Sequence, residues 1–183
     1  MKRAAGGDRD ARRVLFERLR EPAYRVAYRV TGNHEDALDV VQDSFIKAFE
    51  SLGDFQGQSA FKTWLLRIVT NRGLDHLRAR KVRLATPIDP DSESGPLEIA
   101  AREDGTRPGD ALERRELGAR LQGAIEALPP EQRAVFALYA AGEMTYGQIA
   151  EVVGIPIGTV MSRLYHARRR LREMLGDLVS GES

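Results

Sequence analysis

Polar, aromatic and basic side chains recur near the C-terminal end of the chain at helical spacing. A helix turns about 100° per residue, so one face of this segment collects Ser162, Tyr165, His166 and Arg169. The opposite face is an apolar stripe of Val160, Leu164, Ala167 and Leu171. Hydroxyl, imidazole and guanidinium groups are suited to base edges and phosphates. The same pattern is also typical of an amphipathic helix whose arginines are merely solvated.

The residues before this segment predict the turn that would present it to DNA. Gly142 stands where a helix would close in the left-handed conformation. Thr145 and Gln148 form a capping-box pattern that opens a short helix. Gly154 ends that helix after two turns, and Pro156 starts the next one. Two short helices joined through a glycine turn, the second rich in arginine, predict a helix-turn-helix.

The composition excludes several other classes of protein. The chain of 183 residues has no cysteine and only three histidines, so we expect no disulfide, no metal site and no cofactor. Neither a phosphate-binding loop nor a nucleophile with a nearby base is present in the sequence, which argues against an enzyme. No signal peptide and no apolar run of about 18 residues is found. We therefore expect a soluble, cytoplasmic protein.

Charge is divided into blocks along the chain, although the total is only +1. The net charge is −4 over residues 35–50, +6 over 62–83, −5 over 86–110 and +4 over 161–175. Charge runs are usually solvated faces, but two basic helices separated by an acidic block favour two nucleic-acid contacts.

Apolar spacing throughout predicts an all-α protein of two small helical domains. We expect the first over residues 8–84 and the second over residues 112–178. Residues 85–111, rich in proline, glycine, serine and acids, predict a flexible acidic linker. Residues 1–7 are expected to be disordered or truncated.

Two segments resemble a known family. DALDVVQDSFIKAFESLGDFQGQSAFKTWLLRIVTNRGLDHLRARKVR resembles region 2 of the bacterial extracytoplasmic-function (ECF, group IV) sigma factors, of the sigma-E-like kind. LPPEQRAVFALYAAGEMTYGQIAEVVGIPIGTVMSRLYHARRRLREML resembles their region 4. Both blocks stand in the family's order, and the resemblance covers about residues 8–178. A helix-turn-helix alone is a common signal, but its combination with the D-A-x-D-x-x-Q and F-x-T-W-L-x-R-I patterns is highly specific.

The resemblance implies a transcription initiation subunit that binds core RNA polymerase and promoter DNA. In the family, the D-A-x-D-x-x-Q helix contacts the clamp helices of the largest polymerase subunit. This role carries over to Asp36, Asp39, Gln42, Asp43 and Phe45. Without the resemblance, a solvated acidic face would be the favoured interpretation of these residues. The family usually also has an anti-sigma factor, often membrane-anchored, and commonly serves in stress responses.

The resemblance further implies that the first domain captures an unpaired base of the −10 element. Phe55 and Asn71 take that role here, and Arg67 and Arg72 are expected to contact the DNA backbone. Extruding a base from its stack costs a few kcal/mol, which a stacking wall and a polar edge reader can offset. The alternatives are that Phe55 is a hydrophobic staple to the next helix and Asn71 an ordinary surface amide.

The second domain is expected to bind the −35 element. The predicted contact residues are Thr159, Met161, Ser162, Arg163, Tyr165, His166, Arg168 and Arg169. Met161 departs from the family, which often has arginine or lysine at this position, so a polar contact is lost or shifted. A rival interpretation is a free-standing helix-turn-helix regulator that binds DNA without polymerase. The first domain, however, lacks the βα pattern of a receiver, and its basic helix has no role in that interpretation.

Overall fold

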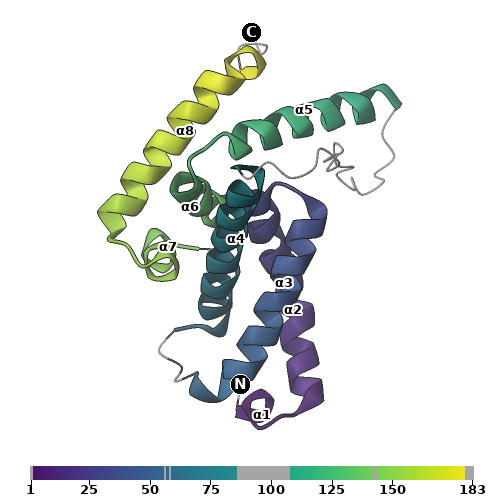
Figure 1. The fold of residues 1–183 in the computed structure, drawn as a ribbon, viewed down its shortest axis with the longest axis vertical. Helices are drawn as coiled ribbons and strands as arrows, with labels where there is room; N and C mark the ends of the chain where they lie inside the picture. Colours follow the sequence, from purple (N-terminus) through teal and green to yellow (C-terminus); the bar gives the residue numbers. More distant parts are fainter. Residues whose placement is uncertain (1, 56, 58, 86–107, 142–143, 180–183) are drawn as a thin grey trace.

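The computed structural model describes residues 2–55, 57, 59–85, 108–141 and 144–179 (Figure 1). Among these residues every regular element is helical, as the sequence predicts. In chain order the helices are α1 (Lys2–Ala5), α2 (Arg9–Thr31), α3 (His34–Glu50), the 3-10 turn Ser51–Asp54, α4 (Phe61–Ala85), α5 (Pro108–Glu126), α6 (Pro130–Ala140), α7 (Tyr146–Val153) and α8 (Ile157–Val179). None of these described helices is both long and apolar enough to cross a membrane.

Helices α2, α3 and α4 pack against one another as the N-terminal unit (Figure 1). Apolar residues at helical spacing form its core: Ala23, Val26, Val30, Ala37, Val41, Phe45, Leu65, Leu66 and Val69. Gly73 allows α4 to approach α2 closely, because a Cβ at this position would lie 2.9 Å from the Val30 side chain. The apolar faces of the three helices therefore meet in this core.

Local hydrogen bonds close the turn between α2 and α3. Gly32 has a φ of 89° and closes α2 with a bond from its N–H to the carbonyl of Tyr28. Asn33 then caps α3, because its side-chain oxygen accepts a hydrogen bond of 2.8 Å from the Asp36 N–H. These two caps set the direction of α3 against α2.

The prediction that residues 1–7 are disordered is wrong for the described part of that segment. Residues Lys2–Ala5 form the short helix α1, and Ala4 is fully buried. Arg12 Nε donates to the Ala4 carbonyl at 3.0 Å, and Asp8 caps α2 through the Ala11 N–H. The apolar contact of one alanine was too weak a signal to detect in a polar, glycine-rich sequence.

The C-terminal unit contains the predicted helix-turn-helix in α7 and α8. Thr145 and Gln148 form the predicted capping box: the Thr145 N–H donates to Gln148 Oε1 at 2.8 Å, and the Gln148 N–H donates to Thr145 Oγ1 at 3.3 Å. Gly154 ends α7 with a φ of 72°. The predicted closure at Gly142 lies outside the described residues.

The predicted linker at 85–111 lies largely outside the described residues, and its described end is helical. Helix α5 begins at Pro108, inside the segment assigned to the linker. Proline suits the first turn of a helix because its missing N–H would have no partner there. The second helical unit therefore begins about four residues before the predicted boundary at 112.

The two units pack directly against each other, which the sequence did not indicate. Helix α6 lies against α2, and α7 lies against α4 (Figure 1). Residues of both units belong to one buried apolar cluster, which includes Val30 and Leu66 as well as Leu138, Ile149 and Val152. The described helices therefore share a core in this arrangement.

Candidate nucleic-acid and protein interfaces

Helix α8 presents the face that its periodicity predicts. Its stripe of Val160, Leu164, Ala167 and Leu171 is buried, while Ser162, Tyr165, His166 and Arg169 are exposed. Burying the stripe against α5, α6 and α7 fixes the rotation of the helix about its axis. The exposed side chains are therefore directed away from the body of the protein.

Two arginines on or beside this face are held by neighbouring groups. The guanidinium carbon of Arg168 lies 4.4 Å from the ring centroid of Tyr139 on α6, a cation–π contact. Arg169 Nε donates to Glu173 Oε1 at 2.8 Å, which raises the pKa of Arg169. Both cations keep a defined direction, which suits contacts with phosphates on either side of a groove. Tyr139 was missed because its ring pairs with Arg168 across 29 positions of sequence.

The remaining residues predicted to contact the −35 element differ in exposure. Thr159 and Arg163 are half-buried at the edge of α8, whereas Met161 is exposed. Thr159 also lies in the first turn, where its N–H bonds to the Pro156 carbonyl at 2.9 Å. The structure thus brings the eight predicted residues onto one helix, with Met161 on the accessible side.

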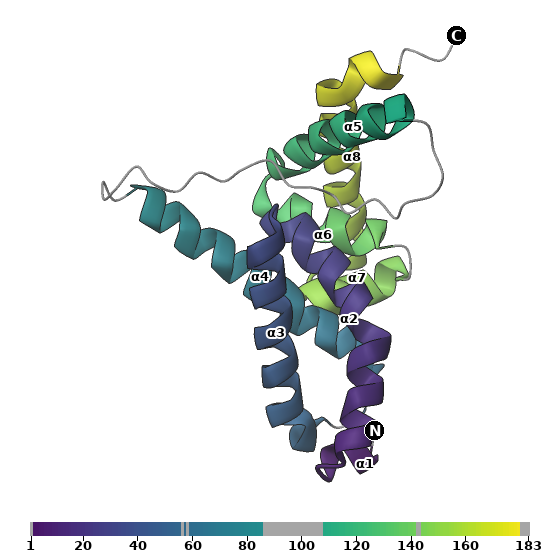
Figure 2. The same ribbon diagram turned by 90° about the vertical axis from the view of Figure 1, so that its right-hand side faces the viewer.

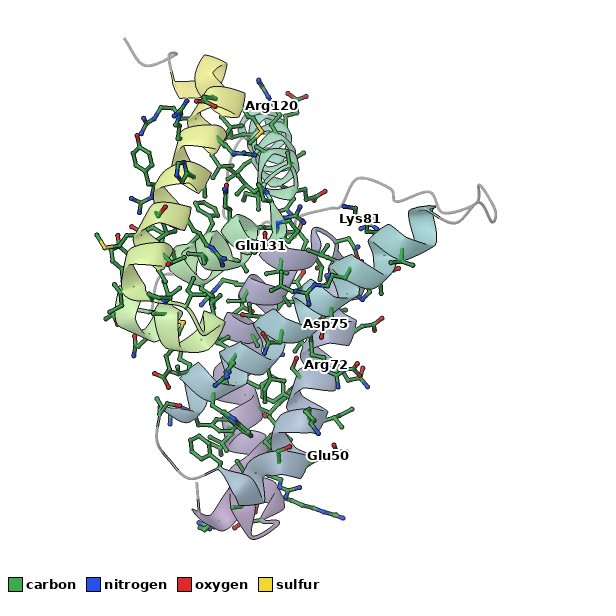
Figure 3. The ribbon with its side chains drawn as sticks, turned by 60° about the vertical axis from the view of Figure 1, so that its left-hand side comes forward. Glu50, Arg72, Asp75, Lys81, Arg120 and Glu131 are labelled. Atoms are coloured by element: carbon green, nitrogen blue, oxygen red, sulfur yellow. The ribbon has the colours of Figure 1, made fainter. Side chains whose placement is uncertain are left out.

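Helix α4 carries three of the four residues predicted to contact the −10 element. Arg67, Asn71 and Arg72 are all exposed. Arg72, Asp75 and Lys81, labelled in Figure 3, follow the helix toward its C-terminal end, which projects from the rest of the protein (Figure 2). Asp75 pairs with Arg78 at 2.7 Å, so part of the local charge is neutralised within the helix. The outer surface remains predominantly basic.

Phe55 lies in the loop before α4 and packs against that helix. Its ring centroid is 5.1 Å from that of Trp64 and 5.9 Å from that of Phe61, and the side chain is half-buried. These contacts are those of a hydrophobic staple. They leave part of Phe55 accessible, so capture of a base at this loop stays a prediction.

The exposed face of α3 combines acids with apolar side chains. Asp39, Gln42 and Asp43 are exposed. Leu38 and Ile46 are also about half exposed on the same helix. Apolar side chains surrounded by carboxylates are typical of a protein-binding surface, because isolated charge alone gives little affinity. Leu38 and Ile46 were missed because neither belongs to the charged motif: Leu38 lies between Asp36 and Asp39, and Ile46 follows Phe45.

Two residues assigned to this face have partners inside the protein. Phe45 is only 3% exposed and meets Phe16 edge-on at 4.8 Å, so it supports the face from below. Its place in the apolar period of α3 already indicated burial. Asp36 bonds Asn33 and lies 3.0 Å from His76 Nε2 on α4, which ties the start of α3 to α4. The exposed part of the predicted set is therefore Asp39, Gln42 and Asp43.

Two family models match the chain. Sigma-70 region 2 covers residues 15–83, and Sigma-70, region 4 covers residues 118–171. The ECF RNA polymerase sigma factor SigW of Bacillus subtilis is 33% identical over 181 residues, which span 97% of this chain and 96% of that protein. The ECF RNA polymerase sigma factor SigE of Mycolicibacterium smegmatis is 38% identical over 93% of this chain and 65% of its own length.

Two solved structures resemble this fold. The sigma factor RpoE in complex with the anti-sigma factor NepR from Bartonella quintana has a TM-score of 0.70 and 25% identity, over 90% of this chain and 96% of that one. CnrH in complex with the cytosolic domain of CnrY has a TM-score of 0.66 and 25% identity, over 100% and 96% of the two chains.

Proposed function

This chain belongs to the extracytoplasmic-function family of RNA polymerase sigma factors, and we propose that it binds core RNA polymerase and directs promoter recognition and transcription initiation. The observation that carries the proposal is the presence of three separate exposed faces on one chain. These are the acidic and apolar face of α3, the basic face of α4 and the polar face of α8. A regulator that acts without polymerase has no use for the first of them.

The face of α3 is assigned to the polymerase clamp helices. Asp39 and Asp43 supply carboxylates for basic partners, and Gln42 supplies an amide. Leu38 and Ile46 add apolar area, which provides affinity when it is buried against a partner. Charge then selects the partner and its orientation.

The faces of α4 and α8 are assigned to promoter DNA. Asn71 and Phe55 would capture an unpaired base of the −10 element, with Arg67 and Arg72 on the backbone. Helix α8 would enter the major groove of the −35 element, as the second helix of a helix-turn-helix does. The polymerase supplies the catalysis, so the chain itself is not an enzyme in this proposal.

Regulation by an anti-sigma factor belongs to the same proposal. RpoE and CnrH, which resemble this fold, are described in complexes with NepR and CnrY. We propose that an anti-sigma factor binds this chain as well. The sigma factor would act in the cytoplasm, where core polymerase meets DNA, during a stress response. A membrane-anchored partner would hold the sigma factor until a signal releases it.

The proposal is tested first by polymerase binding. Asp39→Arg combined with Gln42→Ala should weaken association with core polymerase at least tenfold, because it reverses one charge and removes an amide at an interface. Affinity is measured by titration of labelled protein with core polymerase. Glu151→Arg, a charge reversal at an exposed position on α7, is the matched control. Equal affinity of the double variant and the control would show that the α3 face is only solvated and does not contact polymerase.

A second measurement separates a sigma factor from a free-standing regulator. Specific protection of promoter DNA should require core polymerase together with this chain. If the chain alone gave the same footprint with the same affinity, the regulator interpretation would replace the proposal.

A further inference from the structure

An apolar ridge runs along the exposed side of α8. Ile157, Met161 and Tyr165 are 51%, 53% and 64% exposed, and they follow one another at intervals of four residues. Residues at this spacing lie on the same side of a helix. The ridge occupies the first three turns of α8, and it lies beside the polar residues Ser162, His166 and Arg169.

The ridge borders a hollow whose rim is basic. Tyr146, at the start of α7, lines this hollow together with Met161 and Tyr165. Arg168 and Arg172 line it farther along α8, and both are exposed. An apolar floor with a guanidinium rim is complementary to the edge of a nucleic acid, because the phosphates match the arginines and leave an apolar group for the floor.

The major groove offers one apolar group, the C5-methyl of thymine. The N-terminal residues of a recognition helix are those that contact base edges. Met161 has no hydrogen-bond donor, and its thioether is only a weak acceptor. When an exposed side chain without a hydrogen-bond donor buries a methyl group at a base-reading position, the free energy of DNA binding becomes more favourable.

We propose that Met161 reads a thymine methyl group in the −35 element, beside the apolar ring of Tyr165 on the same ridge. This inference rests on the proposed function and names the base chemistry that α8 selects. From Ile157 to Tyr165 the helix rises about 12 Å, which matches three to four base pairs at about 3.4 Å each. Ser162 and His166 form a polar row beside the ridge and read the hydrogen-bonding edges of the bases. The ridge therefore contacts apolar groups, and the polar row contacts donors and acceptors.

Removing only the methyl groups tests the proposal directly, since deoxyuridine lacks the C5-methyl and keeps the pairing of thymidine. Holoenzyme assembled from core polymerase and the full chain selects from a DNA library randomised at the −35 element. One library is made with thymidine in the random segment and the other with deoxyuridine. The thymidine library should yield thymine at one or more positions. In the deoxyuridine library the preference at such a position should fall about fourfold per methyl. This factor follows from about 0.8 kcal/mol per buried methylene, because about 1.4 kcal/mol corresponds to a tenfold change in affinity.

A double-mutant cycle, which combines a substitution in the protein with removal of the thymine methyl, then identifies the residue that contacts the methyl. Met161→Ala should bind thymidine and deoxyuridine versions of the selected site within about twofold of each other, because the methyl has lost its partner. Met161→Leu keeps an apolar side chain and should retain the roughly fourfold difference. Ser162→Ala should weaken binding but also retain the difference, since it belongs to the polar row.

The outcomes distinguish this inference from the proposed function. Specific selection of a −35 sequence without any difference between the two libraries would overturn methyl reading and leave the sigma function intact. An equal difference in wild type and Met161→Ala would show that another residue reads the methyl, which also overturns the proposal. Failure of the holoenzyme to select any −35 sequence would instead count against the proposed function.

Discussion

Asn71 lies exposed on α4, one helical turn after Arg67, where a side chain can reach a strand that runs along the helix. An amide both donates and accepts, so it can hydrogen-bond the edge of an unpaired base. We predict that Asn71→Ala lowers the opening of the −10 region about tenfold, because one base contact contributes about 1–3 kcal/mol. Permanganate reactivity of unpaired thymines measures the open fraction.

The same variant should leave the other contacts of the protein unchanged. Association with core polymerase and protection of the −35 element should remain within about twofold of wild type, since Asn71 is exposed and lies outside the shared core. Asp75→Ala, on the next turn of α4, is the matched truncation and should not reduce reactivity. Wild-type permanganate reactivity in Asn71→Ala would show that another side chain captures the base.

At the scale of the element, α7 depends on its capping box because eight residues give too few internal hydrogen bonds for a stable isolated helix. Thr145→Ala removes the acceptor for the Gln148 N–H, and should lower the free energy of unfolding by about 1 kcal/mol. Urea unfolding followed by circular dichroism measures this loss. Thr145 is exposed, so the substitution leaves no cavity.

Thr145→Ser tests whether the loss arises from the cap. Serine keeps the hydroxyl and should restore stability to within about 0.5 kcal/mol of wild type. If alanine and serine had the same stability, the capping bonds at the start of α7 would contribute nothing measurable.

Local chemistry explains why elements such as α7 could be predicted from the sequence. Gly32, Thr145 and Gly154 act through bonds within a few residues, and the apolar stripe of α8 sets its exposed face. The packing of α6 and α7 on α2 and α4 depends instead on contacts between residues far apart in the chain. Arg133 reaches the carbonyl of Val30, 103 residues away, and no local pattern specifies that partner.

The same distinction separates the predicted and missed parts of the candidate interfaces. Exposed charges at regular spacing, such as Asp39 and Asp43, could be placed because helical periodicity gives their direction. The pairing of Arg168 with Tyr139 and of Asp36 with His76 requires knowing which helices meet. The sequence therefore locates the faces, and the tertiary packing decides which side chains on them remain available.

Arg133 forms a polar link between the two helical units in the described part of the chain. It is 8% exposed, and its guanidinium donates to the carbonyls of Val30 at 3.1 Å, of Leu128 at 3.2 Å and of Glu126. Burial lowers the pKa of Arg133, but an arginine remains charged at neutral pH. Because Val30 belongs to α2 and the other two carbonyls to the C-terminal unit, the hydrogen bonds of this one side chain connect the two units.

With the two helical units packed together, which we call the closed arrangement, the protein does not span the distance between the two promoter elements. The −35 and −10 elements are about 25 base pairs apart by their positions, or about 85 Å along straight DNA at about 3.4 Å per base pair. Helix α7 packs against both α4 and α8, and eight residues of helix are only about 12 Å long. The units must therefore separate when the chain engages both elements.

We predict that Arg133→Met makes this separation easier in the free protein, because it removes the charged bonds while keeping an apolar side chain of similar length. The chain has no cysteine, so Arg18→Cys and Glu151→Cys, at exposed sites on α2 and α7, carry a donor and an acceptor dye without competing thiols. Transfer efficiency between the dyes should fall in Arg133→Met and stay unchanged in Arg120→Met, which removes an exposed arginine of α5 (Figure 3). Should Arg133→Met lose its helical circular dichroism, Arg133→Lys, which keeps the charge but not the forked geometry, gives the same comparison. Unchanged efficiency in a folded Arg133 variant would mean that the shared apolar core alone holds the units closed.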